Sequence, residues 1–265
     1  MRRSPSAAGR GAPPMAPGRG AAGHRLAASL LYIAGCHAAG PTGGAEARPP
    51  ARVATESTMQ AAIVESLEQL VPSIDEIPAE RRKALDQIAA FVRAHRSAGS
   101  PAKLTFICTG NSRRSHLGQL WAAATARYYG IDGVETYSGG TEPSAINPRT
   151  IAALERAGFV VEPPAQLGEN PHYRVRFAAE AEAIESFSKR FDDSTNPHED
   201  FVAIMTCSEA DEGCPFVPGA TLRISLPYDD PKVADGTPEE SARYDERSRQ
   251  IATEMLYLFA QVRAS

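Results

Sequence analysis

Short apolar runs alternate with stretches of helical periodicity from about residue 100 to the end of the chain. The apolar runs predict strands at residues 104–107, 134–137, 201–205 and 222–226. Amphipathic patterns predict helices at residues 115–129, 147–157 and 239–262. Strands that alternate with helices form a parallel sheet through right-handed crossovers. The pattern therefore predicts an α/β fold around a four-stranded parallel sheet.

Two further helices are predicted ahead of this region, at residues 59–70 and 78–96. In the second, Leu85, Ile88, Ala89 and Val92 recur at the spacing of one helical face. We therefore expect a helical N-terminal extension over residues 59–100 and a catalytic domain over residues 101–265. Residues 162–200 have no regular pattern apart from strand-like alternation at 173–177.

The first 58 residues differ in composition from the rest. They hold seven arginines, no lysine and only two acidic residues, and they are dense in alanine, glycine and proline. Such a segment buries too little apolar surface to offset the entropy lost on ordering, so residues 1–58 are predicted to be a disordered leader.

An alternative for this leader is a lipoprotein-type signal and tether. The apolar run at residues 26–34 is too short to span a bilayer but has the length of a signal-peptide core. It leads into Ile33-Ala34-Gly35-Cys36, which resembles the lipobox of bacterial lipoproteins. The sequence thus leaves open a cytoplasmic protein that starts as late as Met59 and a protein anchored through lipid at Cys36.

Overall composition is that of a globular protein. Of 265 residues, 42% are hydrophobic and 23% are charged, and the formal net charge is -4, which argues against general nucleic-acid binding. Four cysteines are too few for a disulfide scaffold, and their spacing matches no zinc site. We expect no metal and no cofactor.

The loop after the first predicted strand carries the candidate chemistry. This cysteine loop, residues 108–115, reads Cys-Thr-Gly-Asn-Ser-Arg-Arg-Ser and precedes a helix. Its amides and the helix N-terminus can converge on an anion, and Gly110 allows close approach of the backbone. Arg114 can offer a planar fork to a tetrahedral oxyanion. Cys108 at the base of this positive bowl is a candidate thiolate nucleophile, and Ser115 can donate a hydrogen bond to it.

The cysteine loop resembles the phosphate loop of the low-molecular-weight protein tyrosine phosphatases. It is closer still to the thioredoxin-coupled arsenate reductases on the same fold, whose loop also begins Cys-Thr-Gly-Asn-Ser. The similarity continues through Tyr-Ser-Gly-Gly-Thr-Glu at 137–142 and Asn147-Pro148, and covers roughly residues 103–262. The resemblance implies a three-layer α/β sandwich with a central four-stranded parallel sheet.

Roles for single residues follow from the resemblance. It implies that Arg114 binds the oxyanion, that Ser115 supports the thiolate and that Asp230 is a general acid, with Asp229 as its rival. The implied oxyanion-binding residues are Thr109, Gly110, Asn111, Ser112, Arg113 and Arg114. Arg113 stands where many relatives have cysteine or another small residue, and its charge should strengthen anion attraction.

Two more cysteines lie seven residues apart after the third predicted strand, and we expect them in a loop. The resemblance implies a relay in which Cys207 attacks the Cys108–arsenic adduct and Cys214 resolves the resulting disulfide. The implied partners are a small oxyanion and a thioredoxin-like reductant. The structural alternative is that Cys207 and Cys214 are inert core thiols.

Three functions remain open at this point. The first is arsenate reduction, and the second is hydrolysis of phosphomonoesters such as phosphotyrosine through a phospho-cysteine. The third is non-catalytic oxyanion binding. We interpret residues 162–200 as a surface elaboration, although several of its side chains could flank the site: His172, Tyr173, Arg174, Arg176, Phe187, Lys189 and Arg190.

Overall fold

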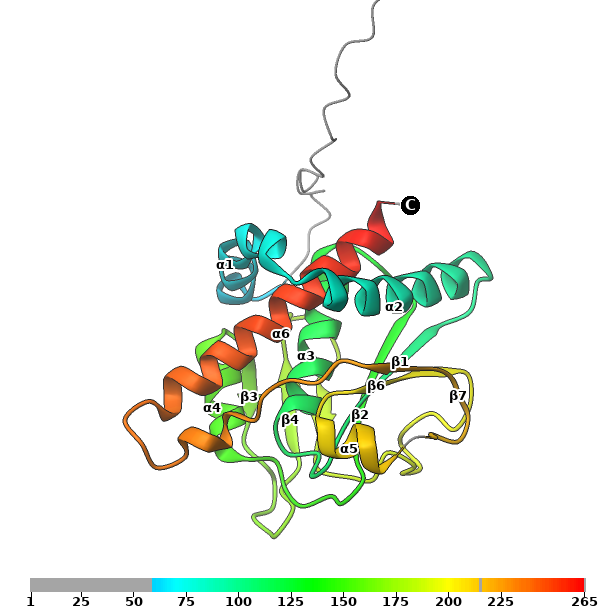
Figure 1. The fold of residues 1–265 in the computed structure, drawn as a ribbon. Helices are drawn as coiled ribbons and strands as arrows, with labels where there is room; N and C mark the ends of the chain where they lie inside the picture. Colours follow the sequence, from blue (N-terminus) through cyan, green and yellow to red (C-terminus); the bar gives the residue numbers. More distant parts are fainter. Residues whose placement is uncertain (1–58, 215, 265) are drawn as a thin grey trace, which may run out of the picture. The chain divides into compact units, whose positions relative to one another are not determined.

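Four parallel strands form the central sheet of the computed structural model, in the order β2-β1-β6-β7 (Figure 1). The structure describes residues 59–214 and 216–264. The leader, residues 1–58, and its lipobox-like Cys36 lie outside the described residues. The predicted α/β architecture with a four-stranded parallel sheet is confirmed.

Every strand predicted for this sheet is present, within a few residues of its predicted bounds. The four strands are β1 (Ala102–Cys108), β2 (Val134–Gly140), β6 (Phe201–Met205) and β7 (Ala220–Ser225). The long helices are α1 (Ala61–Leu70), α2 (Ala79–Ser97), α3 (Arg114–Tyr128), α4 (Pro148–Arg156) and α6 (Glu240–Arg263). Two short 3-10 helices are η1 (Val71–Glu76) and η2 (Pro231–Ala234).

Alternation along the strands divides the core between the two faces of the sheet. Leu104 and Phe106 pack into a large apolar cluster with α2, α3 and α6, whereas Ile107 faces the other way. The second face is covered by α5 (Ser208–Gly213) and by side chains such as Phe191 and Val217. The sheet therefore lies between two layers, as the three-layer sandwich requires.

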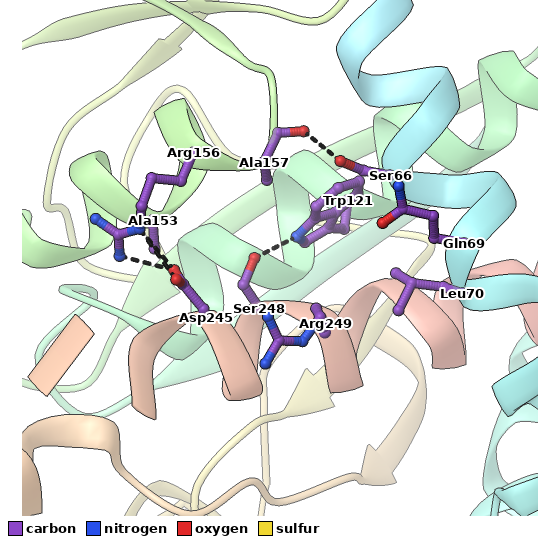
Figure 2. Close-up of a pocket in the computed structure, with 10 residues that line it drawn as sticks. All are labelled: Ser66, Gln69, Leu70, Trp121, Ala153, Arg156, Ala157, Asp245, Ser248 and Arg249. Atoms are coloured by element: carbon purple, nitrogen blue, oxygen red, sulfur yellow. Dashed lines mark hydrogen bonds and ion pairs between the residues drawn. The ribbon is translucent and has the colours of Figure 1, made fainter. Parts of the chain in front are cut away.

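The N-terminal extension packs on the first of these faces. Ile88 on α2 is fully buried in the same cluster as Phe259 on α6, and α1 contacts α6 as well. Figure 2 shows the junction with α1, where the Ser66 hydroxyl donates to the Ala157 carbonyl at 3.0 Å. Nearby, the Trp121 indole donates to the Ser248 hydroxyl at 2.9 Å, beside a pocket of about 310 Å³.

Residues 160–186 form a second sheet that the sequence pattern did not predict. It is antiparallel, with the order β3-β4-β5, and its strands are β3 (Val160–Glu162), β4 (Tyr173–Arg176) and β5 (Ile184–Ser186). Strands of three or four residues are too short for alternation to stand out, so only β4 was visible in the sequence.

The segment between Cys207 and Cys214, which was expected to be a loop, contains a short helix. The two cysteines cap the two ends of α5, a helix of six residues. Ser-Glu-Ala-Asp-Glu is compatible with one helical turn and places acidic residues near the helix N-terminus, where the dipole favours them. Among residues 59–214 and 216–264, no helix is both long and apolar enough to cross a bilayer.

Candidate active site

The cysteine loop connects the carboxyl end of β1 to the first turn of α3. Cys108 is the last residue of β1 and is 3% exposed, and Arg114 is the first residue of α3. Crevices at the carboxyl ends of parallel strands are the usual ligand sites of α/β sheets. The loop therefore occupies the expected position for a binding site.

Backbone carbonyls of the loop all point away from its centre. Those of Cys108, Thr109 and Gly110 accept hydrogen bonds from the amides of residues 141, 142 and 144, at 3.1, 2.8 and 3.1 Å. The Ser112 carbonyl accepts from the Asn147 amide at 3.0 Å. Within the described part of the chain, no acceptor takes a hydrogen bond from the amides of residues 110–112. Those amides are free to bind an anion.

Asn111 fixes the turn of the loop. Its φ of 42° lies in the left-handed region, which asparagine tolerates better than most residues. The side-chain amide donates to the Ser115 hydroxyl at 2.9 Å and accepts from the Lys189 amide at 2.9 Å. Ser115 in turn lies 3.1 Å from the Cys108 sulfur. This chain of contacts orients the Ser115 hydroxyl toward the sulfur.

His116 stabilises the same turn through a hydrogen bond to its backbone. Its Nε2 lies 2.9 Å from the Asn111 carbonyl, which can only accept, so Nε2 carries the hydrogen. Nδ1 then accepts from the Ser138 hydroxyl at 3.3 Å. Burial and the nearby Lys189 charge lower the pKa of His116 to about 3. The imidazole is therefore neutral.

Close approach of backbone is required at Gly140, at the end of β2. A Cβ atom there would lie 2.5 Å from the Thr109 carbonyl oxygen and 2.8 Å from the Asn111 nitrogen. At Gly110 the atom nearest to a Cβ would be the Ser144 hydroxyl oxygen, at 3.3 Å. The steric need for glycine is thus stronger opposite the loop than within it.

Arg114 joins the cysteine loop to the Asp-Asp-Pro segment, residues 227–231. Its guanidinium donates to the Tyr228 carbonyl at 2.8 Å and to the Asp230 carboxylate at 2.9 Å. The buried Arg114 Nε has no hydrogen-bond partner among the described residues. The side chain of Asp229 is 95% exposed and lies 3.5 Å from Arg247. Of the two candidate acids, Asp230 is the one that reaches the loop.

Arg113 has partners outside the loop. Its Nε donates to the Tyr244 hydroxyl at 2.9 Å, and its guanidinium lies 3.8 Å from Asp230 and 3.7 Å from Asp235. Its charge is therefore shared with two carboxylates.

Three cysteines gather at one end of the sheet. Cys108 ends β1, and Cys207 lies two residues after the neighbouring strand β6. Both belong to one apolar cluster, against which Cys214 packs. Thr109 lies between the first two, with its hydroxyl 3.4 Å from the Cys207 sulfur. All three are free thiols. Exposure increases from the buried Cys108 and Cys207 to the half-buried Cys214.

Burial also distinguishes Cys207 chemically. Burial raises the pKa of the Cys207 thiol, although the hydrogen bond from Thr109 and the charge of Arg114 act in the opposite direction. The resting thiol is therefore mainly protonated at neutral pH.

Sequence reasoning missed the part that residues 188–191 play in shaping the loop. The Ser188 hydroxyl donates to the Gly110 carbonyl at 2.9 Å, and the Lys189 amide holds Asn111. The Lys189 carbonyl and the Phe191 amide pair with Gly140 on β2, at 2.8 and 3.0 Å. This part of residues 162–200 is structural support for the site and more than a surface elaboration; backbone contacts of this kind leave no pattern in side-chain types.

Comparison with known proteins supports the similarity of this region to two groups of enzymes. Residues 103–175 match the family model of the low molecular weight phosphotyrosine protein phosphatases. The arsenate reductase of Bacillus licheniformis is 28% identical over 165 residues, which cover 61% of this chain and 97% of the relative. That of Bacillus subtilis is 28% identical over 156 residues, covering 59% and 93%.

One solved structure, described as an arsenate reductase in the phosphate binding state, aligns with a TM-score of 0.38 and 18% identity. The alignment covers 61% of this chain and 98% of that one. The family model and the curated relatives converge on the part of the chain that carries the cysteine loop. By these matches, the part of the chain that carries the cysteine loop resembles the enzymes of the low-molecular-weight protein tyrosine phosphatase superfamily, the arsenate reductases among them.

Proposed function

We propose that this enzyme reduces arsenate through a three-cysteine thiol relay. The observation that carries the proposal is the gathering of Cys108, Cys207 and Cys214 at one end of the sheet, with the first two buried and Cys214 partly exposed. A phosphomonoesterase needs only the first of these thiols. A relay needs all three, ending at a sulfur that a reductant can reach.

Anion binding is the first step of the proposed reaction. The free amides of residues 110–112 and the unpartnered Arg114 Nε are donors for a tetrahedral oxyanion above Cys108. The Cys108 thiolate, supported by Ser115 at 3.1 Å, displaces one arsenate oxygen, which leaves as water after protonation. Asp230 is the proposed proton donor.

Electron transfer follows by attack of Cys207. Its thiolate forms a bond to the Cys108 sulfur, the sulfur–arsenic bond breaks, and the electron pair stays on arsenic, which leaves as arsenite. Cys214 then attacks Cys207, so that the Cys108 thiolate is released and a Cys207–Cys214 disulfide forms. A dithiol reductant of the thioredoxin type supplies the two electrons that reopen this disulfide.

Helix α5 must unwind for the last exchange. Cys207 and Cys214 lie at its two ends, and seven positions along a helix span about 10 Å. A disulfide requires Cα atoms about 4.4–6.8 Å apart. Arg223 holds the helix to β7 by donating to the Asp211 carboxylate at 2.6 Å and to the Cys214 carbonyl at 3.1 Å. These contacts are the ones that oxidation has to break.

Two cysteine variants test the thiol relay and the anion site separately. Cys108→Ser should abolish both arsenate reduction and aryl phosphate hydrolysis. Cys214→Ser should release about one arsenite per chain and then stop, while hydrolysis of the aryl phosphate continues at the wild-type rate. Arsenite release with excess arsenate, thioredoxin and thioredoxin reductase is the measurement.

Cys36→Ser is the matched control, since it removes the chain's fourth thiol and should change neither activity. Repeated turnover of arsenate by Cys214→Ser would contradict the relay. Hydrolysis that survives Cys108→Ser would contradict the site itself.

Hydrolysis of phosphomonoesters is the second candidate function. The contact between Asp230 and Arg114 at 2.9 Å favours it, because a carboxyl group beside the anion site can protonate the leaving oxygen. In this reaction Cys108 takes the phosphoryl group, and Asp230 then activates water. Wild-type enzyme that hydrolyses aryl phosphates but never releases arsenite would favour this function.

The proposed reductant also bears on location. Thioredoxin-type dithiols keep thiols reduced in the cytoplasm, so arsenate reduction fits a cytoplasmic enzyme. A lipid anchor at Cys36 would require another reductant.

A further inference from the structure

The N-terminal extension contacts the Asp-Asp-Pro segment through one side chain. Arg81, in the first turn of α2, donates from Nε and Nη2 to the two carboxylate oxygens of Glu254 at 2.6 and 2.9 Å. Its Nη1 donates to the Pro227 carbonyl at 2.9 Å. The guanidinium also lies 4.8 Å from the centre of the Tyr228 ring. All the hydrogen-bonding nitrogens of Arg81 are thus directed at α6 and residues 227–228.

Glu254 holds the same segment from α6. Its side chain is 2% exposed, and besides Arg81 it accepts a hydrogen bond from the Tyr228 hydroxyl at 2.7 Å. A carboxylate this deeply buried requires a paired cation. Arg81 therefore holds Glu254 in place as the acceptor for Tyr228.

Arg114 binds the same piece of backbone. Arg81 holds the Pro227 carbonyl, and Arg114 holds the next carbonyl, that of Tyr228. Two residues further on, Asp230 contacts Arg114. Arg114 is also a proposed donor to the bound anion, and a shift of its guanidinium toward that anion would weaken its hold on the segment. The contacts of Arg81 and Glu254 then remain to fix the backbone that carries Asp230.

We propose that Arg81 is a positioning residue for Asp230, so that the N-terminal extension is a working part of the active site. The inference rests on the proposed role of Asp230 as a general acid. Arg81 does not touch the anion site. It acts by fixing the backbone at residues 227–228, and displacement of a catalytic group by about 1 Å can cost about 100-fold in rate.

Dependence on the leaving group distinguishes positioning of an acid from general damage. Phenyl phosphate releases a weakly acidic phenol and needs a proton from Asp230, whereas dinitrophenyl phosphate releases a stable anion and does not. Arg81→Ala should lower kcat/KM, which reports phosphoryl transfer to Cys108 and not the later hydrolysis, about 10–100-fold for phenyl phosphate and less than about 3-fold for dinitrophenyl phosphate. Arg81→Lys keeps the charge but loses the two-pronged hydrogen bonding of the guanidinium, so its rate for phenyl phosphate should lie between those of the wild type and Arg81→Ala.

Arg93→Ala is the matched control. Arg93 also joins α2 to α6, by donating to the Gln261 carbonyl at 3.0 Å. This hydrogen bond lies near the C-terminal ends of both helices and involves none of residues 227–231. It should leave both esters unaffected. If Arg81→Ala and Arg93→Ala have equal effects, or if Arg81→Ala slows both esters alike, the proposal is overturned.

A double variant guards against simple misfolding. Arg81→Met combined with Glu254→Gln removes the ion pair without leaving a buried charge unpaired, and the new side-chain amide still offers an oxygen to Tyr228. It should show the same leaving-group dependence as Arg81→Ala. A folded double variant with wild-type kcat/KM for phenyl phosphate would contradict the proposal.

Hydrogen exchange tests the contact without any substrate. The Tyr228 amide donates to the Thr206 carbonyl at 3.1 Å, so its exchange reports on the anchoring of the segment. Exchange there should be at least 10-fold faster in Arg81→Ala than in Arg93→Ala, and equal rates would refute the contact's role. If the wild type turned over neither ester nor arsenate, the proposed function would fail, and this measurement would still decide the role of Arg81 in holding the segment.

Discussion

At the scale of single residues, His116 is neutral because it is buried beneath the cysteine loop. A histidine with a pKa lowered to about 3 in the folded state, against 6.5 when unfolded, takes up its proton only on unfolding as the pH falls. The unfolded state therefore binds more protons between pH 3 and 6.5. The stability contributed by the neutral His116 is fully present above pH 6.5 and is lost as the pH falls from 6.5 toward 3.

His116→Gln tests this at the residue scale. Glutamine can still donate to the Asn111 carbonyl but does not titrate. We expect the wild-type free energy of unfolding to decrease more steeply below pH 6.5 than that of the variant, by up to about 1.4 kcal/mol per pH unit. Urea denaturation at several pH values measures both slopes. Parallel pH profiles would show that His116 is not the titrating group.

Much of the loop was predictable at this scale, because Cys108, Asn111 and Ser115 lie within one local motif. The hydrogen bond between Thr109 and Cys207 could not be predicted, since it depends on how β6 lies beside β1. The position of Arg114 depends similarly on the Tyr228 carbonyl, more than a hundred residues away in the sequence.

At the scale of elements, the end of β2 is packed against the cysteine loop. Gly140 leaves no room for a side chain between Thr109 and Asn111. The loop therefore takes its shape from a neighbouring strand as well as from its own sequence.

Gly140→Ala should push the loop away from β2. We expect a loss of about 1–3 kcal/mol in stability and at least a 10-fold loss in kcat/KM, because the amides that bind the anion move with the loop. Gly168→Ala is the control, since a Cβ there meets nothing within 4 Å. Chemical denaturation and aryl phosphate kinetics measure the two effects. Wild-type kinetics in Gly140→Ala would contradict this account of the loop.

Elements with a continuous apolar run, such as β1 and β6, or with strong helical periodicity, such as α6, were predictable from sequence. Helix α5 and strands β3 and β5 were not, because they contain no longer apolar run and are too short for periodicity to separate them from loop. Their positions are fixed by contacts such as that between Arg223 and Asp211.

At the scale of the whole described molecule, the N-terminal helices share one apolar core with the catalytic region. Ile88 and Leu85 on α2 belong to the same cluster as Leu104 on β1 and Phe259 on α6. Periodicity identified the buried face of α2 in the sequence, but nothing in the sequence indicated which surface would cover it.

Ile88→Ala should therefore destabilise the catalytic region together with α2. We expect a loss of about 2–5 kcal/mol in a single unfolding transition, as for other buried aliphatic truncations. Lys83→Ala, an exposed position on the same helix, should change stability by less than about 0.5 kcal/mol. Separate transitions for α2 and for the catalytic region in calorimetry would show that the core is divided.

Residues 189–191 have a consequence for association between molecules. β2 is an edge strand, and exposed edges recruit strands from other chains. The pairing of Gly140 with Lys189 and Phe191 occupies its outer side, and the Asn196 amide caps the Ser138 carbonyl at 3.0 Å. A second copy cannot extend the sheet along this part of β2 without first displacing residues 189–191. The same residues that shape the cysteine loop therefore also protect the molecule against aggregation through the edge of β2.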